Sequence, residues 1–238
     1  MRRFLAFLRL PAADAFHGLD HCLDRGWRGL LLAGLGLIAG WWVYVPVHEL
    51  LHAAACEAAG GEVTRLEIDE TYGGGLLARI FPFVQPGSEY AGRLSGFDTH
   101  GSTWIYLATD LGPFLLTLFP GVWWLRRAAR SRQAFLFGAA LPFALAPFLS
   151  LTGDAYEIGS LLVTALPPWQ GHPEIVGDDL FRKIEEMGAA GGAPWGNVAG
   201  IAGIALAALL GAVWAFLTYA AGDRVARWAG QAPVPPPR

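Results

Sequence analysis

Charge is scarce in this sequence. Asp, Glu, Lys and Arg make up 16% of the 238 residues, whereas an average soluble domain carries roughly 25%. Because so few charged side chains cannot cover a globule in water, a water-soluble domain is excluded. The 17 basic and 20 acidic residues nearly balance at a net charge of −3, which argues against intrinsic disorder and against nucleic acid as a partner. Two cysteines are too few for a disulfide scaffold.

Long hydrophobic runs make up much of the chain instead. Hydrophobic residues account for 54% of it, and a helix needs about 20 apolar residues to cross a hydrocarbon core of about 30 Å. Four runs are long enough, at about residues 29–50, 103–125, 133–153 and 195–222. A further apolar piece, residues 158–168, is too short to cross alone. The predicted fold class is an all-α polytopic membrane protein with about four transmembrane helices.

The positions of the arginines predict the orientation of these helices. Arginines cluster before the first run, between the second and third runs and after the fourth, as Arg2, Arg3, Arg9, Arg25, Arg28, Arg126, Arg127, Arg130, Arg132, Arg224 and Arg227. Since basic loops stay on the cytoplasmic side, both termini are predicted to be cytoplasmic. In this integral, multi-pass arrangement Cys22 and Cys56 lie on opposite sides of the membrane and form no disulfide.

The same layout divides the chain into three segments. Residues 1–27 mix Phe and Leu with charges, which is typical of an amphipathic helix lying in the membrane interface. Residues 28–222 form the membrane-embedded domain, in which residues 62–85 predict a small β-hairpin at the membrane edge. Residues 223–238 end in a Pro-rich stretch and are predicted to be a flexible tail.

One motif points to specific chemistry. His48-Glu49-Leu50-Leu51-His52 lies at the end of the first run, and residues four apart share one face of a helix, so both imidazoles can bind one tetrahedral zinc ion. Glu49 would lie beside them as the base that activates a water. Ionisable groups at the end of an apolar span usually have a function. The alternative is a histidine pair that binds only water at the end of the helix.

A catalytic zinc usually has three protein ligands, so one more is expected. Asp154 is the best candidate, because up-and-down threading brings the end of the third run to the same membrane face as His48 and His52. The alternative is that Asp154 caps a helix after Gly153.

Two other acids and a second histidine pair are weaker candidates. Asp110 could orient an imidazole or contact substrate, or could equally join two helices as a buried polar group. Glu157 lies three residues after Asp154 and could be an alternative ligand or a solvated neighbour. His17 and His21 share the four-residue spacing, but no base lies between them in the required position, and a metal site there is not favoured.

These motifs resemble the site-2 protease family of intramembrane zinc metalloproteases. The resemblance covers roughly residues 28–166: the HExxH motif in a span, residues 60–63 and 73–75 as the membrane-edge β region, Leu111-Gly112-Pro113 as the Gly-Pro element, and Gly153-Asp154 where the family supplies its third ligand. The sequence departs from the family pattern in three places. The Asn that usually follows Gly-Pro is absent, and only the Pro of the Asn-x-x-Pro element is present, as Pro147. The Asp motif reads Thr-Gly-Asp-Ala instead of Leu-Asp-Gly.

The resemblance implies a zinc-dependent endopeptidase that cleaves membrane-protein or peptide substrates in the lipid bilayer. Zn²⁺ would be held by His48, His52 and Asp154, with Glu49 as base and then acid. The departures from the motifs keep open a second class, a catalytically inactive scaffold or complex subunit. Small residues of the fourth run could pack against a partner helix in that case, namely Gly196, Gly200 and Gly203. A zinc hydrolase acting on a lipid or a small molecule is a third possibility.

Overall fold

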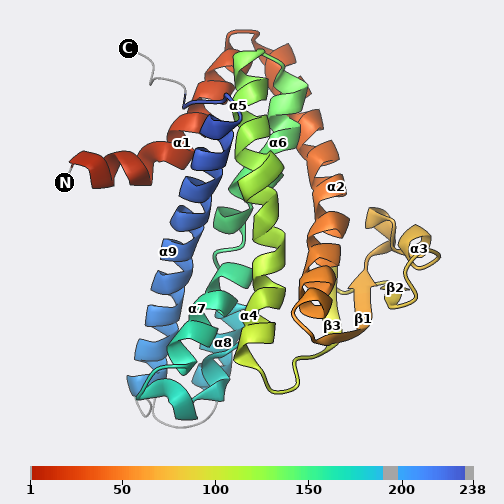
Figure 1. Ribbon diagram of the computed structural model, residues 1–238. Coiled ribbons are helices and arrows are strands. Elements are labelled where there is room, and N and C mark those ends of the chain that lie inside the picture. Colours follow the sequence, from red (N-terminus) through yellow and green to blue (C-terminus); the bar gives the residue numbers. More distant parts are fainter. Residues whose placement is uncertain (1, 190–197, 234–238) are drawn as a thin grey trace. The chain divides into compact units, whose positions relative to one another are not determined.

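The computed structural model describes residues 2–189 and 198–233 and is mostly helical. Figure 1 shows long helices and one small sheet. The longer elements are α1 (Arg2–Leu23), α2 (Trp27–Ala58), α4 (Thr103–Leu111), α5 (Val122–Arg130), α6 (Ala134–Leu149), α7 (Asp154–Thr164), α8 (Leu180–Ala189) and α9 (Val198–Trp228). The short ones are β1 (Glu62–Ile68), η1 (Glu70–Tyr72), α3 (Gly74–Leu77), β2 (Val84–Pro86), β3 (Gly92–Asp98), η2 (Gly112–Phe114), η3 (Thr117–Gly121), η4 (Trp169–Gly171) and η5 (Pro173–Ile175).

Four helical stretches are long and apolar enough to cross a membrane, as the hydrophobic runs predicted. They are Trp27–Ala58, Thr103–Arg130, Ala134–Thr164 and Val198–Trp228. Each helical stretch ends later in the chain than its hydrophobic run predicted. The helix continues past the apolar run through further turns that include charged residues. The third includes most of the short apolar piece at 158–168 as α7. The predicted start of the fourth run, at residue 195, lies outside the described residues.

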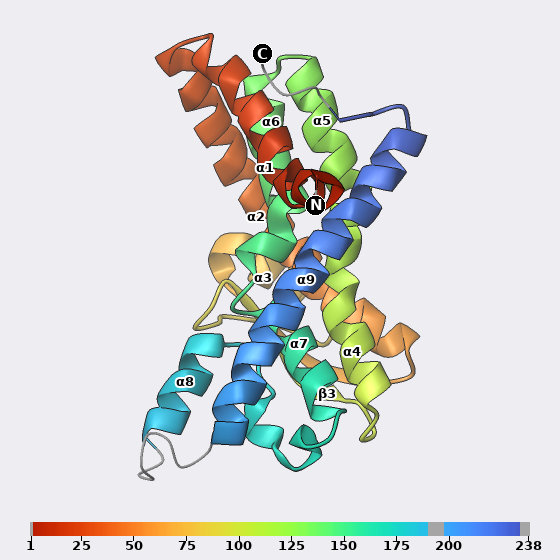
Figure 2. The same cartoon turned by 90° about the vertical axis from the view of Figure 1, so that its left-hand side faces the viewer.

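The chain forms two compact units. The first comprises residues 1–146 together with 219–238, and the second comprises residues 147–218. In the first unit, α1 contacts α5 and α2, and the sheet contacts α2. Figures 1 and 2 place α1 and α5 at the end of α2 that is remote from the sheet. The basic residues of α5 and the HExxH motif are therefore at opposite ends of this unit.

Glycines allow α2 and α6 to pack at backbone distance. A Cβ built on Gly36 would lie 1.9 Å from the carbonyl oxygen of Phe135, and one on Gly40 would lie 2.3 Å from that of Ala139. From the other side, a Cβ on Gly138 would lie 1.9 Å from the carbonyl oxygen of Ala33. Only glycine fits at such contacts, and small residues are the usual means by which helices approach closely in membranes.

The β region differs from the predicted hairpin at residues 62–85. β1 is the central strand of a three-stranded sheet; β2 pairs with it in parallel, and its antiparallel partner is β3, which runs to Asp98. Leu66 and Ile68 of β1 are fully buried with Val84 of β2 against Ala53 of α2.

The hairpin prediction failed because the Gly73–Gly75 run does not form a two-residue turn. Gly73 adopts a φ of 84° between η1 and α3. The chain therefore forms two short helices before β2 pairs with β1. Leu76, Leu77, Ile80 and Phe81 have helical spacing, and Pro82 cannot donate to a strand ladder. β3 was missed because Gly96 and a register shift interrupt its alternation of side chains.

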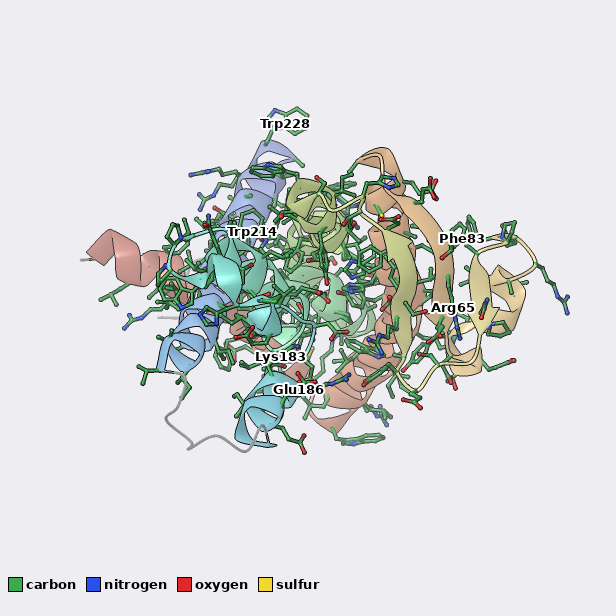
Figure 3. All side chains as sticks on the ribbon, turned by 90° about the horizontal axis from the view of Figure 1, so that it is seen from below. Arg65, Phe83, Lys183, Glu186, Trp214 and Trp228 are labelled. Atoms are coloured by element: carbon green, nitrogen blue, oxygen red, sulfur yellow. The ribbon has the colours of Figure 1, made fainter. Side chains whose placement is uncertain are left out.

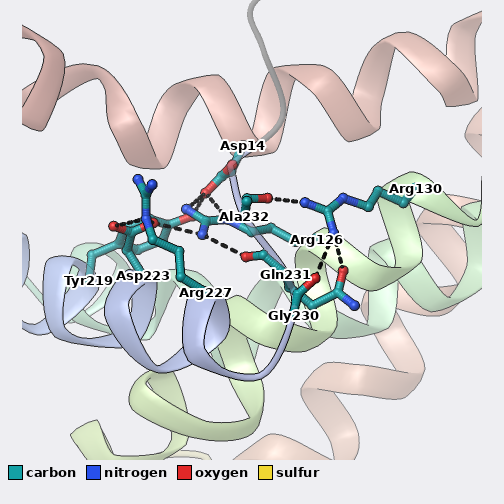
Figure 4. Close-up of polar contacts among 9 residues, drawn as sticks. All are labelled: Asp14, Arg126, Arg130, Tyr219, Asp223, Arg227, Gly230, Gln231 and Ala232. Atoms are coloured by element: carbon teal, nitrogen blue, oxygen red, sulfur yellow. Dashed lines mark hydrogen bonds and ion pairs between the residues drawn. The ribbon is translucent and has the colours of Figure 1, made fainter.

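A buried ionic network joins the two ends of the chain (Figure 4). Arg126 of α5 is only 1% exposed; its Nε and Nη2 donate to Asp14 of α1 at 2.8 and 2.7 Å. Its Nη1 lies 2.7 Å from a carboxylate oxygen of Asp223 of α9. Tyr219 donates to Asp14 at 2.8 Å, and Arg227 binds both oxygens of Asp223 at 3.0 Å. The two carboxylates compensate the buried guanidinium.

Helices lie near both ends of the described chain. α1 falls within the segment 1–27, and it buries a face made of Pro11, Asp14, Gly18 and Cys22. α9 continues to Trp228, so the first residues of the predicted tail at 223–238 are helical. Arg130 then donates to the Gly230 carbonyl at 3.2 Å, the Gln231 side chain at 2.7 Å and the Ala232 carbonyl.

The second unit has its own small core. Tyr156 and Val163 of α7, Ile175 of η5, and Ile204 and Ala207 of α9 are buried together. Gly159 and Gly211 allow α7 and α9 to approach closely, since a Cβ on either would lie 2.0 or 2.3 Å from a carbonyl oxygen of the other helix. On α8, Arg182 and Lys183 pair with Glu186 at 2.9 and 3.2 Å, and Figure 3 shows the last two side by side.

Breaking the ionic network should destabilise the protein strongly. Asp14→Ala leaves the buried guanidinium of Arg126 short of one carboxylate, and such a loss typically costs about 3–5 kcal/mol. Chemical unfolding of the purified protein in detergent micelles measures the change. Asp20→Ala, on an exposed position of the same helix, is the matched control and should change the free energy of unfolding by less than about 0.5 kcal/mol. Equal effects of the two variants would contradict the buried network.

The contact between α2 and α6 gives a second prediction. Gly40→Ala places a methyl group where the Ala139 carbonyl oxygen lies at 2.3 Å, so the helices must separate at a cost of about 1–3 kcal/mol. Gly34→Ala on the same helix meets no atom within 4 Å and should be neutral or stabilising by up to about 1 kcal/mol. Thermal unfolding of both variants checks this; a Gly40→Ala protein as stable as Gly34→Ala would disprove the close contact.

Candidate metal centre

The two histidines of the HExxH motif converge in the structure. His48 and His52 lie one turn apart in α2, and their Nε2 atoms are 3.1 Å from each other. Two nitrogens bound to one tetrahedral zinc ion at 2.0–2.1 Å would be about 3.3 Å apart. The imidazoles are therefore spaced as ligands of one metal ion without a change of rotamer.

The other nitrogen of each imidazole has a protein partner. Nδ1 of His52 donates to the carbonyl oxygen of Thr109 at 2.9 Å, which leaves the lone pair on Nε2. Nδ1 of His48 lies 2.6 Å from the hydroxyl of Tyr44, one turn earlier in α2, and the rings of these two residues are in contact. Such hydrogen bonds orient metal-binding histidines and make them more basic.

A close contact between two elements positions the Thr109 carbonyl. Gly112, just after α4, packs on α2 so closely that a Cβ there would lie 2.4 Å from the carbonyl oxygen of Leu51. Pro113 follows in η2, where its missing N–H costs nothing. Leu111-Gly112-Pro113 thus allows α4 to approach α2 closely, and this approach brings Thr109 to His52.

Glu49 lies between the histidines in sequence and packs against the sheet. A Cβ on Gly92, at the start of β3, would lie 2.4 Å from Cγ of Glu49 and 3.1 Å from its Oε1. Glycine at this position therefore leaves room for the carboxylate. β3 is an edge strand in the sheet order β2-β1-β3, so the predicted base lies next to the end of an edge strand.

Asp154 is the first residue of α7, and Gly153 occupies the capping position. The alternative in which Asp154 is itself the cap is therefore wrong. His48 and His52 belong to the first unit and Asp154 to the second; as a candidate metal ligand, Asp154 would join the two histidines. Two imidazoles and one carboxylate are a donor set typical of catalytic zinc.

The other predicted acids are buried but do not belong to this group of ligand atoms. Asp110 is 3% exposed and follows Thr109 in α4. Glu157 is buried one turn after Asp154 in α7, and its backbone carbonyl accepts from Ser160.

The second histidine pair is also in contact. Nε2 of His17 and Nε2 of His21 are 3.1 Å apart. Asp24 lies 3.7 Å from Nδ1 of His21, but among the residues that the structure describes no group of three metal-binding side chains includes this pair. Spacing alone therefore does not distinguish the two pairs; the third ligand does.

Tyr44 and Thr109 are the site residues that sequence reasoning missed. Tyr44 has a detectable signal, because it lies exactly one helical turn before His48 and can reach its ring. Thr109 has none, since it contributes a backbone carbonyl whose residue type is immaterial. Such partners become visible only once the packing of α4 on α2 is known.

Burial of His17 predicts a pH-dependent stability. Its pKa lies below the ordinary value because the ring is partly buried and His21 disfavours a second positive charge, while Asp14 and Asp20 oppose this shift. The unfolded chain therefore binds the proton more readily. His17 contributes stability that is full above about pH 6.5 and is lost as the pH falls through the lower folded pKa. His17→Gln should flatten the fall in melting temperature between pH 7.5 and 5; an unchanged pH profile would refute this.

Comparisons with protein-family models, curated proteins and solved structures find no match to this chain. The geometry of the site therefore carries the functional argument.

Proposed function

We propose that this protein is a zinc-dependent intramembrane endopeptidase of the site-2 protease type. The observation that carries the proposal is the convergence of the Nε2 atoms of His48 and His52 with Glu49 between them. Asp154 would supply the third ligand atom. The Nδ1 atom of each histidine has a protein partner, and the two Nε2 atoms face each other. A histidine pair with a purely structural role would not need this arrangement.

Membrane insertion is supported by the surface of the long helices. α2 exposes large apolar side chains along its first half, including Leu31, Ile38 and Trp42, and α9 exposes Leu209 and Leu217. A contiguous apolar surface of this kind is unfavourable in water and favourable in hydrocarbon. The four long helices would cross the membrane, with both termini on the cytoplasmic side because the arginines cluster there.

The residues would divide the chemistry of peptide hydrolysis as follows. His48, His52 and Asp154 would hold the metal. The Thr109 carbonyl keeps His52 in the ligating tautomer, and the Tyr44 hydroxyl orients the ring of His48. A bound zinc ion supplies the Lewis acid that polarises a carbonyl and acidifies water. Glu49 accepts the proton of the attacking water and delivers it to the leaving amine.

Substrate would bind by strand addition. A membrane helix must unwind to expose a peptide bond, and an extended segment can pair with the edge of a sheet. β3 offers such an edge, and its first residue, Gly92, lies against Glu49. A substrate strand on β3 would thus have its backbone guided toward the catalytic carboxylate.

The second candidate is a scaffold that keeps the metal and cleaves nothing. The missing Asn after Leu111-Gly112-Pro113 favours it, because the chain departs there from the pattern of the active family. The proposed partner-binding glycines support it less: the space at Gly203 is filled by Trp169 and Ile175 of the same chain. Gly196 lies outside the described residues.

Metal content and activity test the proposal together. Wild-type protein purified without chelators should carry about one zinc per chain, and His48→Ala should lose it because one of three ligands is gone. Glu49→Gln should keep the zinc but cleave a transmembrane reporter peptide about 10²–10⁴-fold more slowly, the usual contribution of a general base. Elemental analysis by mass spectrometry and gel-based cleavage in micelles are the measurements.

The matched control is Glu57→Gln, an exposed acid on the same helix, which should retain both zinc and activity. Zinc-free wild-type protein would refute the metal centre. Zinc-loaded protein that cleaves nothing, with or without Glu49, would refute the peptidase and favour the scaffold.

A further inference from the structure

We propose that a basic pocket at the end of α5 binds the phosphate headgroup of an anionic phospholipid. The pocket has a volume of about 440 Å³ and lies in the first unit, between the last turns of α5 and the start of α6. The side chains that matter are those of Trp123, Arg127, Arg130, Ser131 and Gln133. The pocket is at the end of the unit remote from the HExxH motif.

The charge of the pocket is positive. Two arginines line it, and no acid is among the described residues of its wall. Arg126 is neutralised by Asp14 and Asp223, but among the described residues no carboxylate pairs with its neighbour Arg127. Arg130 binds only neutral oxygens, such as the Gln231 side chain at 2.7 Å. A negatively charged ligand would neutralise the positive charge of Arg127 and Arg130.

The donors of the pocket suit a phosphate group. Arg127 is exposed, and its guanidinium lies over the Trp123 ring at 5.5 Å from the centroid, which restrains its planar donor groups. Guanidinium groups bind phosphate oxygens in a bidentate manner. Ser131 adds a hydroxyl, and Gln133 adds an amide directly before α6, whose first N–H groups favour an anion.

The position of the pocket favours a lipid over free phosphate. The span Thr103–Arg130 ends at Arg130, so in a membrane the pocket would lie at headgroup level. Trp123 and Trp124 in its wall are the residue type that is enriched at this level, and Leu136 gives an apolar surface for the glycerol region. Basic pockets between transmembrane helices on the cytoplasmic side typically bind anionic headgroups.

The inference rests on the membrane insertion proposed above but not on the zinc chemistry. Native mass spectrometry of the full chain, released from micelles with equal phosphatidylglycerol and phosphatidylcholine, tests it. We expect phosphatidylglycerol adducts to dominate and Arg127→Gln to reduce them about five- to tenfold. Arg127→Lys, which keeps the charge and the fold but not the bidentate geometry, should lie between the two. Glu49→Gln should bind lipid like the wild type.

The matched control is Arg224→Gln, which removes an exposed arginine of α9 outside the pocket. It should leave the lipid adducts unchanged. An equal loss with Arg224→Gln would mean general attraction to the basic end and would overturn the site. Equal binding of both lipids, or full displacement of phosphatidylglycerol by millimolar inorganic phosphate, would overturn the choice of a lipid ligand.

Discussion

The candidate metal centre depends on one close contact between helices. Gly112 lets the end of α4 pack against the Leu51 carbonyl of α2, and at this distance the Thr109 carbonyl accepts the Nδ1 proton of His52. A larger residue at 112 would move the carbonyl away and leave the imidazole free to rotate or change tautomer. The two Nε2 atoms of the motif converge because a backbone contact, remote in sequence, holds one of them in place.

The scarce charges of the chain are used in two separate places. At one end of the first unit, Arg126 is buried but compensated by two carboxylates, so it stabilises the junction of the chain ends and has little capacity for chemistry. At the other end, the Nε2 atoms of His48 and His52 lie 3.1 Å apart, and the proposed metal ion would bind between them.

The parts of the fold that depend on local composition were predictable. Four long apolar helices follow from the hydrophobic runs, and the convergence of His48 and His52 follows from the helical period. Up-and-down threading of the helices predicts Asp154 as the third ligand, and this stays a prediction. The sheet was not predictable, because its strand order is decided by helical turns between β1 and β2. Arg126 and Asp14 are 112 positions apart in sequence, so nothing local indicates that they pair.

Zinc K-edge X-ray absorption spectroscopy on the purified full chain measures the metal ligands directly. We predict two imidazole nitrogens together with oxygen donors at about 2.0–2.2 Å from the metal, and loss of the imidazole signal in a His48→Ala, His52→Ala double variant. A sulfur ligand at about 2.3 Å, which would involve Cys22 or Cys56, or an imidazole signal that persists in the double variant, would contradict a centre formed by His48, His52 and Asp154.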